Sequence, residues 1–270
     1  MQPRVAIDPN QNRSQVAFDF LGMVAGAAVL GKVEAGESES GDSLQGFIAD
    51  LSDEQVQGFL QQPRATAKQL LGNATTRTIY DLHRFQNSAQ PVFAATIARE
   101  QHVNSANGME SPVQVTFSYS DGFGREVQTK VQAEPGNAPQ RESNAENPDR
   151  PGKLILENGK PKLVLTDSRW AGNGPTVYNS KGKPVKQYEP FFSSTHLYEA
   201  EPEMVMAGVT PILFYDPAQR VVATLRPNHT FEKVVFDPWQ QTTWDVNDTL
   251  LIANPKADGD VGSFFERLPD

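Results

Sequence analysis

Short runs of β-branched and aromatic residues recur along the chain, separated by clusters of Pro, Gly, Asn and Asp. This pattern is typical of β-strands joined by turns. In the run 230–236, alternation places apolar residues on both faces, which indicates a strand with neighbours on both sides. The sequence therefore predicts a mainly β chain of antiparallel strands and hairpins. The predicted strands are 113–119, 125–132, 153–157, 162–166, 212–215, 220–225 and 230–236.

Residues 43–72 break this pattern. Leu44, Phe47, Ile48 and Leu51 recur at three- and four-residue spacing, which is typical of a helix. The tetrapeptide from Ser52 to Gln55 has the form of a capping box at the start of a second helix. A third helical turn is expected to open at the proline in position 63 and to stop at the glycine in position 72. We predict two or three short helices inserted into a sheet.

Residues 134–152 contain four prolines among Asn and Glu residues and lack the apolar density of an ordered core. We predict that this interval is an exposed loop.

Charge and composition exclude several classes of protein. With 24 Lys and Arg against 33 Asp and Glu the net charge is −9, so we expect no nucleic-acid partner. The absence of cysteine excludes disulfides and thiolate metal sites. The longest apolar stretch near the N-terminus, 16–30, is too short and polar for a membrane span, so we expect no direct membrane insertion. Residues 1–15 show no Sec signal peptide.

One short unit recurs at irregular intervals. An aromatic residue is followed by Asp or Asn, two variable residues, often Gly and a basic residue, and then a β-branched run. This order predicts a hairpin, because an Asx side chain caps a turn and glycine accepts a positive φ. Tyr80-Asp81 is a degenerate copy. The turn positions that we predict to be structural are Asp19, Gly22, Asp121, Gly124, Asn179, Gly182, Asp216 and Asp237.

A longer match supports the repeat. Pro9-Asn10 precedes the first unit, and Pro227-Asn228 precedes the last unit at the same distance. Both segments predict a strand that is entered from one turn and left through another.

These units resemble the tyrosine-aspartate (YD) repeats of Rhs proteins. The segments 118–126, 187–193, 226–230, 236–240 and 244–249 are similar to the Rhs-like region of the B component (SpvB/TcaC/TcdB-like) of bacterial insecticidal toxin complexes. The resemblance extends from about residue 8 to residue 268. It implies a curved Rhs-like sheet over 1–270 as a single shell segment, with the insert at 43–72, and a chain that is a fragment of a larger subunit.

The resemblance also implies a function and partners. In that family the B and C components form a hollow β-shell that encloses a cytotoxic effector. We therefore expect a non-catalytic structural part of a virulence-associated toxin complex, with the Rhs-like C component and its enclosed effector as partners. A pore-forming A component would be reached indirectly, through a propeller absent from this chain. The expected location is extracellular, as part of the secreted complex, after synthesis in the bacterial cytoplasm.

The enzyme alternatives stay open at this point. Asp216-Pro217 and Asp237-Pro238 are paired aspartates that could serve an Rhs-type aspartate autoprotease. The segments 193–195 and 199–201 contain a serine-rich tripeptide and a Glu-x-Glu, as in an SpvB-like ADP-ribosyltransferase, but they lie too close together in sequence. We assign no catalytic, cofactor or metal-binding residue.

Weaker possibilities involve hydrolysis, calcium and sugars. Ser193 to His196 places hydroxyls beside a histidine, as a hydrolase requires, but only in sequence. Asp8, Asn10 and Asn12 have calcium-loop spacing, but position 13 is Arg where such a loop needs Gly. An aromatic-dense stretch with Trp239 could bind sugars, although we expect these rings to pack between strands.

Overall fold

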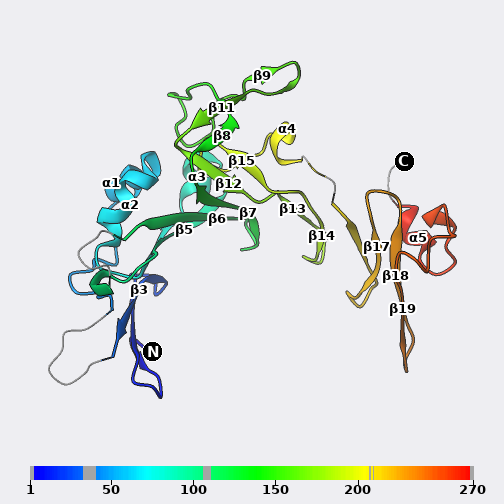
Figure 1. Cartoon of the computed structure of the whole chain (residues 1–270), viewed down its shortest axis with the longest axis horizontal. Helices are drawn as coiled ribbons and strands as arrows, with labels where there is room; N and C mark the ends of the chain where they lie inside the picture. The colour runs from blue at the N-terminus through cyan, green and yellow to red at the C-terminus, as the bar shows by residue number, and fades with distance from the viewer. Residues whose placement is uncertain (1–2, 33–40, 106–110, 207, 209, 268–270) are drawn as a thin grey trace. The chain divides into compact units, whose positions relative to one another are not determined.

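The computed structural model describes residues 3–32, 41–105, 111–206, 208 and 210–267. It is mainly β, with antiparallel strands and a few short helices, which confirms the predicted fold class (Figure 1). Among these described residues, no helix has the length and apolar character that crossing a lipid bilayer requires.

The chain divides into two compact units. Unit 1 comprises Met1–Gly172 and Phe192–Tyr198, and unit 2 comprises Asn173–Phe191 and Glu199–Asp270. Each unit has a sheet of its own. In the described part of the chain, the nine-stranded sheet lies in unit 1 and a separate four-stranded sheet lies in unit 2.

Unit 1 is built on a nine-stranded sheet in the order β1-β2-β3-β4-β5-β6-β7-β12-β15. From β1 to β12 each neighbour pair is antiparallel, so hairpin connections suffice for most of the sheet. The strands are β1 (Val5–Ile7), β2 (Arg13–Phe18), β3 (Val24–Gly31), β4 (Thr76–Asp81), β5 (Val92–Arg99), β6 (Val113–Ser120), β7 (Glu126–Ala133), β12 (Arg169–Gly172) and β15 (Phe191–Ser193).

One face of this sheet carries the main core. Burial alternates along β5 and β6, so every second residue faces the helices α1 (Asp53–Gln61) and α2 (Pro63–Leu71). Phe117 stacks on Phe59 of α1 with ring centroids 5.6 Å apart and meets Trp170 edge-on at 5.7 Å. The fully or nearly fully buried residues of this cluster are Phe59, Leu60, Ala67, Leu71, Ala74, Ile79, Phe93, Ala95, Ile97, Val115, Phe117, Tyr119 and Trp170.

The helical insert is present in part. Ser52 and Gln55 form the predicted capping box, Pro63 opens α2, and Gly72 ends it at φ +57°. The predicted helix over 44–51 is wrong, because this stretch forms turns, with Gly46 at φ +73°. Its apolar residues pack against the same core without helical hydrogen bonding.

The interval 134–152 is not simply an exposed loop. It contains β8 (Gly136–Pro139), which pairs with β11 (Leu163–Thr166), and Ala138 is fully buried. The proline-rich composition concealed this strand, because its partner lies far along the chain. The remaining elements of unit 1 are α3 (Arg84–Ser88), η1 (Val103–Ser105), β9 (Leu156–Glu157) and β10 (Lys160–Pro161).

Unit 2 contains a four-stranded antiparallel meander packed on its C-terminal helix. Phe231 and Phe265 are buried with their ring centroids 5.4 Å apart, and Phe214 meets Phe265 edge-on at 4.9 Å. The elements are β13 (Thr176–Tyr178), β14 (Pro184–Gln187), α4 (Pro202–Val205), β16 (Ile212–Tyr215), β17 (Val221–Leu225), β18 (Phe231–Phe236), β19 (Gln241–Trp244), η2 (Pro255–Ala257) and α5 (Gly262–Phe265).

A buried ion pair ties the meander to its C-terminal segment. Lys233 Nζ lies 2.8 Å from the Asp258 carboxylate and 2.7 Å from that of Asp260. Burial alone lowers the pKa of Lys233, but the hydrogen bonds and charges of both aspartates outweigh it, so the net pKa is raised. Asp258 is almost fully buried, whereas the side chain of Asp260 is 48% exposed. Lys233 of β18 is therefore the structural partner of the buried Asp258 carboxylate.

Replacing Lys233 by Met is expected to lower the free energy of unfolding by about 3 kcal/mol, because it leaves the Asp258 carboxylate buried without its cation. Asp260→Asn, which removes only the exposed partner, is expected to cost less than about 1 kcal/mol. Urea unfolding followed by tryptophan fluorescence measures both. If both variants lose the same free energy of unfolding, the buried pair of Lys233 with Asp258 is not the main source of the stabilisation.

Candidate functional site

The hairpin between β6 and β7 is closed by a turn with a distinct hydrogen-bond pattern. The Asp121 N–H donates to the carbonyl of Arg125, and the Gly124 N–H donates to the carbonyl of Asp121, both at 3.0 Å. One carboxylate oxygen of Asp121 accepts the N–H groups of Phe123 and Arg125 at 2.9 and 3.0 Å. The other accepts Nε of Arg125 at 2.7 Å. Gly124 lies at φ +74°, where glycine is favoured.

Asp19 and Asn179 close two other hairpins in the same way. The Met23 N–H donates to Oδ1 of Asp19 at 2.8 Å in the β2–β3 turn. In the β13–β14 turn, Oδ1 of Asn179 accepts the N–H groups two and four residues later, each at 3.0 Å. Gly22 and Gly182 take φ values of +80° and +75°. An amide oxygen can thus take the place of a carboxylate oxygen as the acceptor of these N–H groups.

Asp216 and Asp237 occupy the two turns of unit 2 that join β16 to β17 and β18 to β19. Oδ1 and Oδ2 of Asp216 accept the backbone N–H and Nε of Arg220 at 2.9 and 2.8 Å. Gln219 holds the left-handed position at φ +67°, so a residue other than glycine fills it here. The Asp237 turn is one residue shorter, because its N–H donates to the carbonyl of Gln240.

The same backbone turn also precedes β2 and β18, where it was not predicted as a copy. The N–H groups of Asp8 and Arg226 donate to carbonyls four residues later at 3.0 and 2.8 Å. Gln11 and His229 both take φ +65° at the left-handed position. The sequence signal was the matched Pro-Asn dipeptide, which occupies the second and third positions of both turns.

Asp8 acts as a turn cap and not as part of a calcium loop. Its carboxylate accepts the backbone N–H and the side-chain amide of Asn12, each at 2.8 Å. Asp19 belongs to the next turn along the chain. Among the described residues, no group of three or more His, Asp or Glu side chains is placed to hold a metal ion.

Hydrogen bonds within the Asp216 and Asp237 turns lower the pKa of both carboxyl groups. The Arg220 backbone N–H lowers the pKa of Asp216, and the Trp239 backbone N–H lowers the pKa of Asp237. Two aspartates that share a proton in catalysis need one raised pKa. Turn capping is therefore the role that the electrostatics of both residues favour over acid–base chemistry.

Tyr80-Asp81 differs from the other copies. The connection that follows it contains α3, and Asp81 lies 3.5 Å from Arg84 of that helix. The degenerate copy therefore ends β4 without forming the repeated turn.

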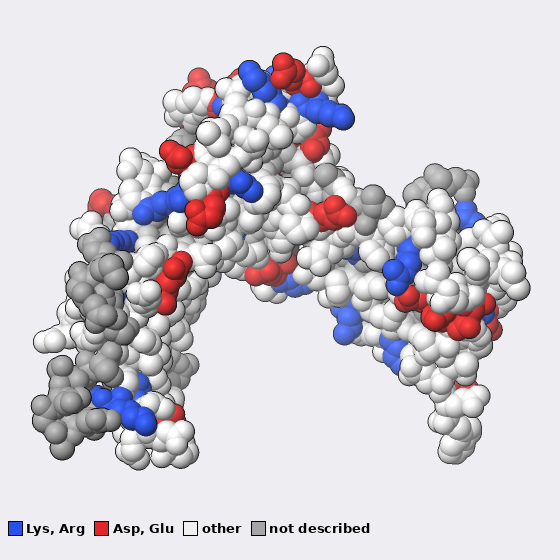
Figure 2. Space-filling view, in the orientation of Figure 1, with Lys and Arg blue, Asp and Glu red and all other residues white. Residues whose placement is uncertain are grey.

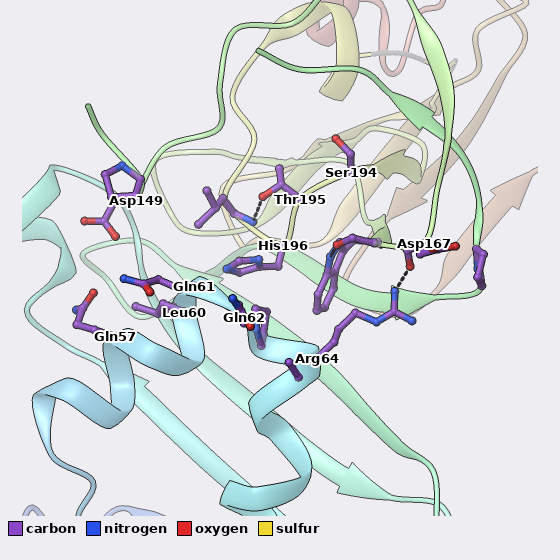
Figure 3. Close-up of a pocket in the computed structure, with 17 residues that line it drawn as sticks. Gln57, Leu60, Gln61, Gln62, Arg64, Asp149, Asp167, Ser194, Thr195 and His196 are labelled. Atoms are coloured by element: carbon purple, nitrogen blue, oxygen red, sulfur yellow. Dashed lines mark hydrogen bonds between the residues drawn. The ribbon is translucent and has the colours of Figure 1, made fainter. Parts of the chain in front are cut away.

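The Ser193–His196 segment lies beside a cavity of about 700 Å³, with α1 and α2 on its other side (Figure 3). The Ser193 hydroxyl donates to the carbonyl of Thr195 at 3.0 Å, and the Ser194 hydroxyl donates to that of Pro139 at 2.9 Å. Both hydroxyls are thus directed to backbone oxygens and not to His196. The polar residues lining the cavity are Gln57, Gln61, Gln62, Arg64, Asp149, Asp167, Ser168, Ser194, Thr195 and His196.

His196 is a buried neutral imidazole. Burial, with the positive charges of Lys130 and Arg84, lowers its pKa to about 3. Its ring lies against Phe117 and Trp170, with centroids 4.8 and 5.6 Å away. A general base needs a pKa near the working pH, so these surroundings favour a packing role.

The other enzyme motif and the aromatic stretch also take structural positions. Glu199 is 1% exposed, and Glu201 is the N-cap residue of α4. The indole of Trp239 is 94% exposed at the tip of its turn, contrary to the expectation that it packs between strands. Phe192 is 45% exposed, and its ring centroid lies 3.5 Å from the guanidinium carbon of Arg169.

On the face shown in Figure 2, Lys and Arg side chains lie in small separate groups, interspersed with Asp and Glu. This part of the surface lacks the continuous basic area that phosphate backbones require.

Comparison with known proteins identifies the fold. No family model and no curated protein matches the sequence. Among solved structures, a crystal structure of TcdB2-TccC3 matches 94% of this chain with a TM-score of 0.65 and 24% identity. The chain shares its fold with part of a Tc toxin. A Photorhabdus luminescens Tc holotoxin pore matches 95% of it, with a TM-score of 0.65 and 19% identity.

A structure of TcdB2-TccC3-Cdc42 matches 93% of the chain, with a TM-score of 0.64 and 20% identity. The sequence resemblance to toxin-complex B components is thus confirmed at the level of the fold. The chain spans 11% of the matched TcdB2-TccC3 chain and 13% of the matched holotoxin chain.

Replacing Asp121 by Ala is expected to lower the free energy of unfolding by about 1 kcal/mol, because two turn N–H groups lose their acceptor. Asp121→Asn is expected to retain most of this stability, since Asn179 caps its turn through an amide oxygen. Chemical denaturation of both variants measures the difference. If Asp121→Asn loses as much free energy of unfolding as Asp121→Ala, the hydrogen bonds from the turn N–H groups to this side chain do not stabilise the turn.

The Asp216 turn predicts a pH dependence. Its folded pKa lies below the ordinary value of about 3.9, so the charge stabilises the fold above that pH and the stabilisation is lost as pH falls through the folded pKa. Asp216→Asn keeps an acceptor oxygen but lacks the charge that holds Arg220. In thermal melts, the Tm of wild type should exceed that of Asp216→Asn at pH 7. This difference in Tm should disappear below about pH 4. A Tm difference that stays constant from about pH 7 to about pH 3 would show that the charge of Asp216 does not stabilise the fold.

Proposed function

We propose that this chain is a non-catalytic wall segment of a bacterial toxin-complex shell, in the B-type component, and that it encloses an effector polypeptide together with an Rhs-like C component. The observation that carries this proposal is the fold match over 94% of the chain to TcdB2-TccC3. The wall is a run of antiparallel strands whose hairpins are closed by Asx-capped turns.

The chemistry of the open face of unit 1 supports containment. The face of β4, β5 and β6 turned away from the α1–α2 helices has no charged side chain, and Thr78, Thr96 and Thr116 are directly paired across it. Small neutral side chains give a held polypeptide few strong contacts, because they provide neither salt bridges nor large apolar anchors. The residues on this face are Thr76, Thr78, Tyr80, Val92, Ala94, Thr96, Ala98, Gln114, Thr116, Ser118 and Ser120.

The sheet edges support assembly with further strands. β1 is the first strand of its sheet, and its residues Val5 and Ile7 are 51% and 60% exposed. β19 is the last strand of the unit 2 meander. Unpaired strand edges are templates for pairing with another chain. Within a toxin complex, the remaining sheet of the B and C components would cover them.

Co-expression with the C component of the same toxin complex tests the proposal. The chain is expected to co-purify with it. Ile7→Lys is expected to weaken co-purification several-fold, because a charge on β1 opposes edge pairing. Ile48→Lys is the matched control, since Ile48 is 63% exposed in the irregular segment between β3 and α1 and not on an edge strand.

Size-exclusion chromatography of the chain alone provides a second measurement for the same prediction. Wild type is expected to self-associate at micromolar concentration, and Ile7→Lys is expected to reduce this association. A chain that stays monomeric and never binds the C component would overturn the proposed function.

A further inference from the structure

The cavity of about 700 Å³ beside His196 has the size of a ligand-binding cleft, a class that spans about 300–1,000 Å³. All of its lining residues belong to unit 1, so the cavity is complete within that unit. Its inner wall is fixed by packing, because Trp170 and His196 both lie against the buried ring of Phe117. This wall suits an apolar side chain. The apolar residues lining the cavity are Leu60, Pro63, Ala65, Pro135, Pro148, Trp170 and Leu197.

Two side-chain amides of α1 open onto this cavity. Gln57 and Gln61 are solvent-exposed and line it, and neither amide has a hydrogen-bond partner among the described residues. They are four residues apart, so they share one face of the helix and lie about 6 Å apart along its axis. An extended peptide presents an N–H and a C=O on the same edge every two residues, which is about 6.6 Å. Since each amide offers a donor and an acceptor, the pair matches two successive pairing positions of an extended peptide.

The same end of the cavity carries negative charge. Figure 3 shows the carboxylate of Asp149 directed toward the side chains of Gln57 and Gln61. The Asp149 side chain is 34% exposed, and its Oδ1 lies 3.1 Å from Nη1 of Arg84. The same arginine nitrogen lies 3.5 Å from the carboxylate of Asp81. One guanidinium is therefore shared by two carboxylates, which leaves an excess negative charge at this end.

The rest of the lining does not cancel this charge. His196 is neutral, because burial and the charges of Lys130 and Arg84 lower its pKa to about 3. In the view of Figure 3, Arg64 lies on the other side of His196 from Asp149 and donates to the backbone carbonyl of Asp167. In formal charge, Arg64 and the Asp167 carboxylate cancel. The cavity therefore favours a basic occupant over an acidic one.

We propose that this cavity binds an extended peptide segment that carries an apolar residue and a Lys or Arg two positions apart. Residues at this spacing face the same side of an extended chain, so both side chains enter the cavity. The apolar side chain packs on the wall that includes Trp170, the backbone pairs with the amides of Gln57 and Gln61, and the cation reaches Asp149. Since β1 and β19 contribute nothing to the cavity, this binding does not rest on the proposed function.

Titration calorimetry of the full chain with the blocked peptide acetyl-Ala-Leu-Ala-Lys-Ala-Leu-Ala-amide tests the proposal. Saturable binding is expected, with a dissociation constant about tenfold lower than that of the same peptide with Glu in place of Lys. Asp149→Asn is expected to reduce this difference several-fold, and it keeps the backbone carbonyl to which Nη2 of Arg84 donates at 2.7 Å. Glu157→Gln is the matched control, because it removes an exposed carboxylate of unit 1 that does not line the cavity.

A double variant, Gln57→Ala with Gln61→Ala, tests the backbone contacts. It is expected to weaken binding of the Lys peptide about tenfold and to keep the preference for Lys over Glu, because the amides are neutral. Alanine favours the helix, so α1 is retained. Gln69→Ala, which removes an exposed amide of α2 outside this cavity, is expected to bind like wild type. Absence of saturable binding, equal affinity for the Lys and Glu peptides, or wild-type binding by the double variant would overturn the proposal.

Discussion

The structure depends on one local interaction: a side-chain oxygen of Asp or Asn that accepts the backbone N–H groups of its own turn. A hairpin register slips easily unless the turn fixes it, and a slip of one residue would move every side chain to the opposite face. At Asp121 and Asn179 the acceptor holds the N–H groups two and four residues later, which determines the loop length and hence the register of the following strand. The capped turns therefore keep the core face and the open face separate.

The turns could be predicted because their chemistry lies within five consecutive residues. Asp, a variable pair, Gly and a basic residue carry the acceptor, the positive φ and an ion pair, as Asp121, Gly124 and Arg125 illustrate. The turn at Arg226 was predicted from its Pro-Asn dipeptide but not recognised as a copy of the unit, because it has the same backbone without an Asx residue at its first position. The capping box at Ser52 is local in the same sense and was predicted correctly.

What could not be predicted depends on residues far apart in sequence. The pairing of Ala138 with Val164 makes a strand of a proline-rich interval, and nothing near Ala138 indicates its partner. The spacing of apolar residues over 44–51 serves packing on the core equally well in turns, so periodicity alone misidentified a helix. The burial of Arg77 left no sequence signal, because an arginine at an alternate strand position is usually solvent-exposed.

The two faces of the unit 1 sheet distribute charge in an unusual way. The open face of β4 to β6 is neutral, whereas the helix-covered side of the sheet holds charged groups such as Arg77 and Lys130. Lys130 is satisfied by the carbonyl of Thr195 at 3.1 Å, while Arg77 has the single bond to Ile48. In the proposed shell, a wall face that does not hold on to its contents should lack ionic groups, and the charged side chains Arg77 and Lys130 lie on the covered side instead. The neutral open face and the charged covered side are therefore the arrangement that the proposed containment role calls for.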